Sequence, residues 1–161
     1  MVTLASLWMP IVLSAVLVFI ISSLIHMMLG YHANDIRRVP DEEAARKAIG
    51  PLKIPPGDYS IPRAGSMAEM KDPAYAEKLN QGPVVFLTVL PSGPITMGKS
   101  LTLWFAYALL VSFVAAYVAS RALEPGAHYL SVFRFVGVTA FASYSLALLQ
   151  NSIWWSENWG T

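Results

Sequence analysis

The sequence predicts an all-α membrane protein. We expect three transmembrane helices and a polar loop that contains two short helices and a small β-hairpin. The first observation is composition, since 55% of the 161 residues are hydrophobic and only 13% are charged. A soluble domain typically carries about 25% charged residues. The second is that nine of the eleven Lys and Arg, and eight of the ten Asp and Glu, lie between residues 31 and 99. The rest of the chain is therefore apolar enough for lipid.

Residues 4–30 form the first predicted span. No formal charge occurs between Leu4 and Leu29. Pro10 suits the first turn of a helix, where its missing N–H is tolerated. The 20 residues from Pro10 to Leu29 would extend about 30 Å, the thickness of a hydrocarbon core. Because no Lys or Arg precedes Arg37, we expect a retained helix rather than a cleaved signal peptide.

Residues 100–121 and 127–155 form the second and third predicted spans. Lys99 and Arg121 bound 21 uncharged residues in the second. The third contains Arg134, so it either begins near Tyr129 with Arg134 extending to the interface, or begins after Arg134. Trp154, Trp155 and Trp159 are typical of an interfacial aromatic belt at its far end.

Residues 31–99 form the polar loop. "PDEEAARKAIGP" and "DPAYAEKLNQGP" each predict a short helix, capped by Asp41 and Asp72 and ended by Gly-Pro. "PVVFLTVLPSGPITMG" predicts a small β-hairpin with "PSGP" as its turn, while "KIPPGDYSIPRAGS" is too rich in proline for a central strand. Five basic residues flank this loop and two flank the short connection. This bias predicts a cytoplasmic long loop in a bacterial inner membrane.

"GPITMGKS", residues 93–100, fits the phosphate-loop pattern G-x-x-x-x-G-K-[ST]. In that motif, backbone amides at a helix N-terminus bind phosphates. Here the following helix is apolar enough for lipid, and the loop is too short and proline-rich for a nucleotide-binding sheet. We therefore expect no nucleotide. A smaller hypothesis is that Lys99 and Ser100 contact a lipid headgroup.

His26 is a titratable residue near the end of the first predicted span. Such a group can be a pigment ligand, for example to the magnesium of a (bacterio)chlorophyll, a proton relay, or a hydrogen-bonding partner of a neighbouring helix. We favour hydrogen bonding. The sequence predicts no intrinsic cofactor and no metal site.

Small residues recur every four positions in the second span, at Ala108, Ser112, Ala116 and Ser120. One face of small residues permits close helix packing, so these residues are predicted to contact partner subunits. Arg134 is predicted either to extend to the interface or to pair with an acid on a partner. The net charge of +1 gives no sign of a nucleic-acid partner.

Three segments, "SSLIHMMLGYHANDIRRVPDEEA", "IPPGDYSIPR" and the stretch from "GPVVFLTVL" to "VFRFVG", resemble a family of small, uncharacterised bacterial integral membrane proteins. The resemblance covers most of the chain and implies no catalytic residue or substrate. It does imply a further apolar segment after "SIWW", so a fourth transmembrane helix is expected beyond the C-terminus of this sequence.

Two functions fit these observations. The first is a non-catalytic accessory subunit of a larger energy-converting membrane complex, photosynthetic or respiratory, that stabilises helix packing or assembly. The alternative is a small oligomeric transporter or channel subunit with a pathway lined by Ser22, His26, Ser112, Thr139 and Ser143. We expect no enzyme, because no nucleophile–base pair or metal-ligand spacing occurs in the sequence.

Overall fold

The computed structural model describes residues 2–32 and 34–159. It divides into two compact units, Met1–Arg37 with Ile95–Thr161, and Arg38–Pro94. We call the first the three-helix unit and the second the polar unit. The division follows the charge distribution, although the predicted polar loop, 31–99, extends several residues beyond the polar unit at each end.

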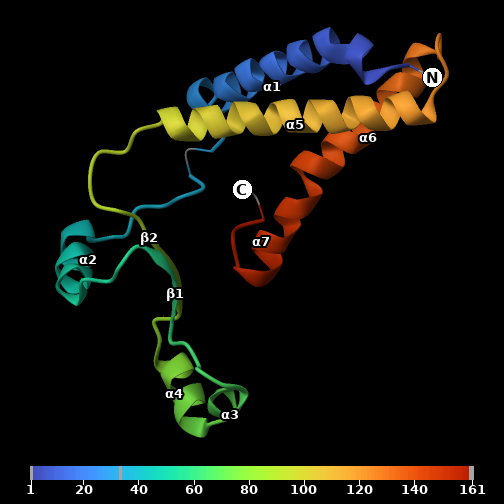
Figure 1. Cartoon of the computed structure of the whole chain (residues 1–161). Helices are drawn as coiled ribbons and strands as arrows, with labels where there is room; N and C mark the ends of the chain where they lie inside the picture. Colours follow the sequence, from blue (N-terminus) through green and yellow to red (C-terminus); the bar gives the residue numbers. More distant parts are fainter. Residues whose placement is uncertain (1, 33, 160–161) are drawn as a thin grey trace. The chain divides into compact units, whose positions relative to one another are not determined.

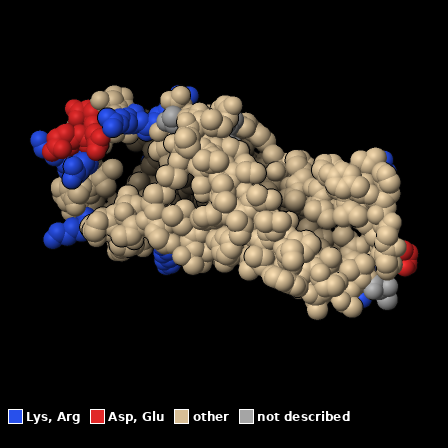
Figure 2. Space-filling view, turned by 90° about the horizontal axis from the view of Figure 1, so that it is seen from above, with Lys and Arg blue, Asp and Glu red and all other residues tan. Residues whose placement is uncertain are grey.

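The three-helix unit contains the three predicted long helical segments (Figure 1). The first consists of η1 (Leu4–Leu7) and α1 (Trp8–Met28). The second is α5 (Gly98–Ala122). The third comprises α6 (Tyr129–Tyr144), η3 (Leu146–Leu148) and α7 (Leu149–Trp154). Each segment is long and apolar enough to cross a membrane. On the face shown in Figure 2, these helices carry almost no charged side chains.

Helix α5 lies at the centre of this unit and packs against both α1 and α6. The buried side chains all come from α1 and α5, and most are small: Ile11, Ala15, Ala108, Val111, Ala115, Ala119 and Ser120. Small side chains let two helix backbones approach closely. Helix α6 contributes no buried residue; its side chains are half-buried or exposed.

The third long segment begins at Tyr129, as in the first of the two predicted alternatives, but it is not continuous. Helix α6 stops at Tyr144, and the 3-10 turn η3 separates it from α7. The hydroxyls of Thr139 and Ser143 donate to the carbonyls of Phe135 and Thr139, at 2.7 and 2.8 Å. Such bonds to the preceding turn often bend a helix, which accounts for a break just beyond Ser143.

The polar unit contains both predicted short helices, α2 (Glu42–Ile49) and α4 (Pro73–Gln81). The carboxylates of Asp41 and Asp72 accept hydrogen bonds from Ala44 N and Ala74 N, each at 2.8 Å. These bonds confirm the predicted N-caps. A short 3-10 turn, η2 (Gly50–Leu52), follows α2.

A further helical turn, α3 (Met67–Met70), was not predicted. Ser66 caps it by accepting a bond from Glu69 N at 3.2 Å. The Glu69 carboxylate in turn accepts a bond from Gly65 N at 2.6 Å. The S-x-x-E spacing of Ser66 and Glu69 is the capping-box pattern, so the sequence did carry a signal for this turn.

The predicted β-hairpin was wrong. Strand β2 (Val85–Val89) forms, but its partner is β1 (Gly57–Ile61), in antiparallel register from Gly57↔Val89 to Ile61↔Val85. The prolines around β1 flank the strand and do not interrupt it. Both strands of a two-stranded sheet are edges, where proline is tolerated. No strand follows "PSGP" in residues 95–97.

Candidate functional site

The most organised polar region of the three-helix unit begins with a bond between α1 and α5. The indole Nε1–H of Trp104 donates to the hydroxyl oxygen of Ser22 at 2.8 Å. The Ser22 hydroxyl donates in turn to the carbonyl of Phe19 at 3.1 Å. Both side chains are partly buried. Because a Trp N–H in apolar surroundings needs an acceptor, this bond fixes the level at which the two helices meet.

A second bond joins α5 to α6 close to the end of α6. The Tyr107 hydroxyl donates to the backbone carbonyl of Ser143 at 2.5 Å. The Tyr107 and Tyr144 rings meet edge to face, with centroids 5.4 Å apart. The Trp104 ring lies 5.7 Å from Tyr107 and 6.0 Å from Tyr144. The broken end of α6 is thus held against α5 by one hydrogen bond and three aromatic rings.

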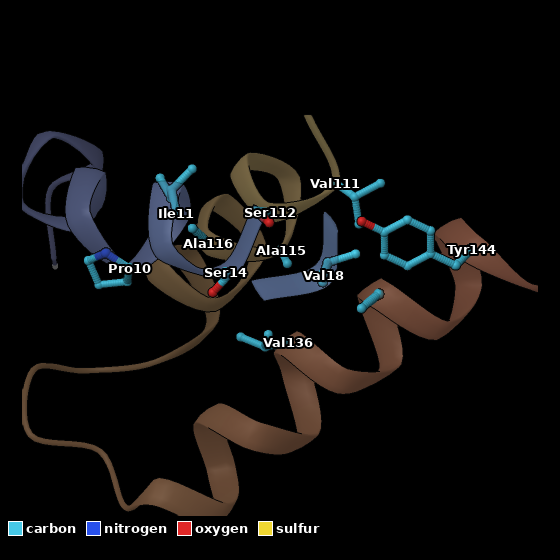
Figure 3. A pocket seen from close by; sticks show the side chains of 11 residues that line it. Pro10, Ile11, Ser14, Val18, Val111, Ser112, Ala115, Ala116, Val136 and Tyr144 are labelled. Atoms are coloured by element: carbon cyan, nitrogen blue, oxygen red, sulfur yellow. The ribbon is translucent and has the colours of Figure 1, made fainter. Parts of the chain in front are cut away.

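A cavity of about 300 Å³ lies among α1, α5 and α6 (Figure 3). Its walls are mostly apolar, and three hydroxyl-bearing residues line it: Ser14 of α1, Ser112 of α5 and Tyr144 of α6. The Tyr144 hydroxyl is buried beside Val111 and has no hydrogen-bond partner in residues 2–32 and 34–159. The full lining is Pro10, Ile11, Ser14, Val18, Val111, Ser112, Ala115, Ala116, Val136, Ala140 and Tyr144.

A second cavity, of about 240 Å³, shares Pro10, Ala116 and Val136 with the first. It extends to Ser120 and Glu124 near the end of α5. Since α1 and α6 each pack on α5 but not on each other, the two cavities form one trough between α1 and α6. We refer to the pair as the trough.

His26 lies one turn beyond Ser22, and its ring Nδ1 is 2.7 Å from the Ser22 carbonyl. A carbonyl only accepts, so Nδ1 donates, and Nε2 is the nitrogen that has a lone pair when the ring is neutral. The ring stacks on His32 with centroids 4.4 Å apart, and His32 Nδ1 contacts the Asp35 carboxylate at 2.6 Å. Within the described residues, no group of three or more His, Asp or Glu is placed to hold a metal ion.

Lys99 and Ser100 occupy the first turn of α5 and are exposed. Met97 precedes the helix without a side-chain cap, so the first amides of α5 are free of intrahelical partners. The helix packs against α1 and α6, and the sheet formed by the described residues has only two strands, which are antiparallel. The phosphate-loop letters therefore lack the parallel sheet on which a nucleotide site is built, and the absence of a nucleotide remains a prediction.

The four small residues of α5 have two different environments. Ala108 and Ser120 are buried, whereas Ser112 and Ala116 are half-buried and line the first cavity. The buried face of α5 is shifted from the predicted stripe and includes Val111 and Ala115.

Arg134 is exposed in the second turn of α6 and has no ion pair within residues 2–32 and 34–159. It lies five residues after Tyr129, about 7.5 Å along the helix, a distance that a long side chain can span to reach an interface.

The residues predicted to line a pathway between copies of the chain include two hydrogen-bonded pairs, Ser22 with His26 and Thr139 with Ser143. Of Ser22, His26, Ser112, Thr139 and Ser143, only Ser112 lines either cavity. The sequence reasoning missed Ser14, Trp104, Tyr107 and Tyr144, of which Trp104 gave the clearest signal as an N–H donor inside an apolar run.

Comparison of the chain with protein-family models, curated proteins and solved structures finds no match. Function must therefore be inferred from the residues and geometry described above.

Proposed function

We propose that this chain is a multi-pass protein of the bacterial inner membrane. In this proposal it is a non-catalytic accessory subunit of a larger energy-converting complex, photosynthetic or respiratory. The observation that carries the proposal is the contrast between the two sides of α6. Its inner side is tied to α5 by the Tyr107–Ser143 bond, while none of its residues is buried.

Helix α6 exposes large apolar side chains. Phe133, Val138 and Phe141 are 60%, 68% and 61% exposed. In a bilayer these side chains can face lipid, but aromatic and small residues on one helix also favour packing against another transmembrane helix. The partners we propose are therefore other membrane subunits and the surrounding lipid.

The polar side chains of the three-helix unit support a structural role. The bonds Trp104–Ser22 and Tyr107–Ser143 each join two helices. The first cavity is lined by hydroxyls without a carboxylate or an imidazole, which supports a role without catalysis; the carboxylate of the trough, Glu124, lines the second cavity.

Two minor contacts belong to the same proposal. Lys99 and Ser100, at the exposed start of α5, are suited to a lipid headgroup phosphate. A Lys99→Ala change should then lower binding to anionic lipid. The free Nε2 of His26 is chemically able to ligate the magnesium of a (bacterio)chlorophyll, and a His26→Leu change that left pigment content unaltered would remove that role.

The main proposal can be tested by photo-crosslinking in native membranes. A photoreactive residue at Phe141, on the uncovered side of α6, should capture a different membrane subunit. The control is the same residue at Tyr117 on α5, which is 46% exposed and should capture less. After extraction in mild detergent, the captured subunit should migrate on a native gel with pigment-bearing or quinone-reactive proteins.

The alternative is a small oligomeric transporter or channel subunit. The break between α6 and α7 favours it, because interrupted transmembrane helices commonly line transport sites. In that case, crosslinking from Phe141 would yield only homo-oligomers of this chain, and no companion subunit would migrate with it. That result would overturn the accessory-subunit proposal.

A further inference from the structure

We propose that the trough binds a lipophilic quinone, whose carbonyl oxygens accept hydrogen bonds from Ser14, Ser112 and Tyr144. The inference requires that the three long helices cross a bilayer. It does not depend on which subunits surround this chain.

The hydroxyls of Ser14, Ser112 and Tyr144 differ from the other hydroxyls of the long helices. Within the long helices, Ser23, Thr139 and Ser143 each donate to the carbonyl four residues earlier, at 2.7–2.8 Å. Ser14 and Ser112 make no hydrogen bond among the described residues, although both line the cavity. The Tyr144 hydroxyl is also without a partner and is buried.

These three hydroxyls come from three different helices and lie around one largely apolar space (Figure 3). A hydroxyl that loses water and gains no partner is unfavourable; this applies to the buried hydroxyl of Tyr144 and, in a bilayer, to the exposed Ser14 and the half-buried Ser112. A ligand that supplies acceptor oxygens would satisfy several of them together. The donor set therefore points to carbonyl groups rather than to a hydrocarbon.

The position of Ser112 along α5 excludes a phospholipid ester as the source of these carbonyl groups. Ser112 lies 14 residues after Gly98 and 10 residues before Ala122, which places it about 21 and 15 Å from the two ends of α5. It is thus near the middle of a hydrocarbon core of about 30 Å. The ester carbonyls of a phospholipid stay close to the headgroups and cannot reach this level. A quinone dissolves in the bilayer and can bring a ring carbonyl there.

The volume and the apolar walls of the trough also suit a quinone. A volume of about 300 Å³ is at the lower end of the range for small-molecule sites and suits one substituted ring. Val18, Val136 and Ala140 provide apolar walls. The second cavity, of about 240 Å³, continues past Ala116 toward Ser120 and Glu124, and its apolar part at Leu7, Ala119 and Val132 can accept the first part of a hydrocarbon tail.

The test uses the full chain in lipid nanodiscs with a photoreactive azido-benzoquinone carrying a decyl tail. Labelling should saturate, should be displaced by unlabelled decyl-benzoquinone, and should map to residues 111–116 and 136–144. Ser14→Ala, Ser112→Ala and Tyr144→Phe should each weaken displacement about fivefold, the effect of one lost hydrogen bond. Tyr117→Phe removes an exposed hydroxyl outside the trough and should change nothing.

A second variant separates binding from folding. Ala140→Leu fills the cavity while leaving all three hydroxyls in place, so it should abolish saturable labelling. Circular dichroism should show unchanged helix content in every variant. Labelling that does not saturate, or that is equal in Tyr144→Phe, the serine variants and the wild type, would overturn the proposal.

If a helix of another chain fills the trough instead of a quinone, a cysteine placed there will react differently. Since the chain contains no cysteine, Ala140→Cys provides a single reactive site in the trough. If this cysteine crosslinks efficiently to a helix of another chain in native membranes, the trough is a protein interface and the quinone assignment is wrong. If the decyl-benzoquinone protects the cysteine from reaction, in native membranes and in nanodiscs, the quinone assignment is supported.

Discussion

The indole of Trp104 joins α5 to α1 by a side-chain hydrogen bond. Its single N–H has the hydroxyl of Ser22 as acceptor, at 2.8 Å. Hydrogen bonds between helices in membranes are worth about 0.6 kcal/mol on average and about 1.7 kcal/mol at most. The Trp104 ring also packs against the Tyr107 and Tyr144 rings, and we place the bond in the upper part of that range.

We therefore expect Trp104→Phe to destabilise the protein by about 1–2 kcal/mol, since it removes the donor and part of the ring packing. Ser22→Ala should cost about 1 kcal/mol because it leaves the indole N–H unpaired. Reversible unfolding in mixed detergent micelles, followed by circular dichroism, measures both changes.

The double variant distinguishes a direct bond from two independent effects. If the pair interacts, Trp104→Phe with Ser22→Ala should cost less than the sum of the single changes. Trp8→Phe is the matched control, because Trp8 is 62% exposed at the start of α1, and it should cost less than about 0.5 kcal/mol. Strict additivity of Trp104→Phe and Ser22→Ala would contradict the role assigned to the bond.

The sequence predicted which helices contain the key polar residues, but it did not predict what those residues contact. Ser22, Ser112 and His26 were recognised as polar groups within apolar segments, but their surroundings were not. Trp104 and Ser22 are 82 residues apart in the chain, and nothing local to either one specifies the other. Tyr144 was missed for the same reason, since its significance comes from the helix break and the cavity beside it.

At the scale of elements, the N-cap of α2 provides a quantitative test. The Asp41 carboxylate accepts a bond from Ala44 N at 2.8 Å, and no residue of α2 is buried. The cap therefore contributes a large share of the stability of this helix. Asp41→Ala should cost about 1 kcal/mol, whereas Asp41→Asn keeps an acceptor and should cost little.

Amide hydrogen exchange measures this effect directly. In Asp41→Ala, exchange at Ala44 and in the rest of Glu42–Ile49 should accelerate about fivefold, in proportion to the lost free energy. Exchange in α4, which has its own cap at Asp72, should be unaffected. Unchanged exchange at Ala44 would show that the cap does not stabilise α2.

The elements that were predicted correctly depend on neighbouring residues. Asp41, Asp72 and Pro73 are local signals, and both short helices formed where these signals place them. The partner of β2 is a non-local property, and here the prediction failed because β1 comes from the proline-rich segment before α3. The break after Tyr144 also escaped prediction, since apolar content continues across it.

At the scale of the whole molecule, the division of charge determines the division into units. The polar unit, Arg38–Pro94, has no buried side chain among its residues, all of which the structure describes. Its two-stranded sheet and short helices are marginal by themselves. The three-helix unit has the buried contacts, and the apolar length of its segments argues for a place in the bilayer.

Membrane sidedness follows from basic residues close to the ends of the spans. Five such residues flank the long polar segment and two flank the α5–α6 connection, so the polar unit should be cytoplasmic and the connection periplasmic. Single cysteines can test this in a chain that has none of its own. We choose Met70 in the polar unit, Pro125 in the connection and Trp159 after α7, all of which are exposed.

A membrane-impermeant maleimide applied to spheroplasts should label Pro125→Cys, and should label Met70→Cys and Trp159→Cys only after permeabilisation. The reverse pattern would show that the chain is inserted the other way.

The labelling of Trp159→Cys also tests whether the third long segment, which is broken at η3, crosses the membrane. Its 26 residues would span about 39 Å as a continuous helix, but the turn at η3 allows the chain to bend back. If Trp159→Cys and Pro125→Cys are labelled from the same side, the third segment re-enters the membrane without crossing it.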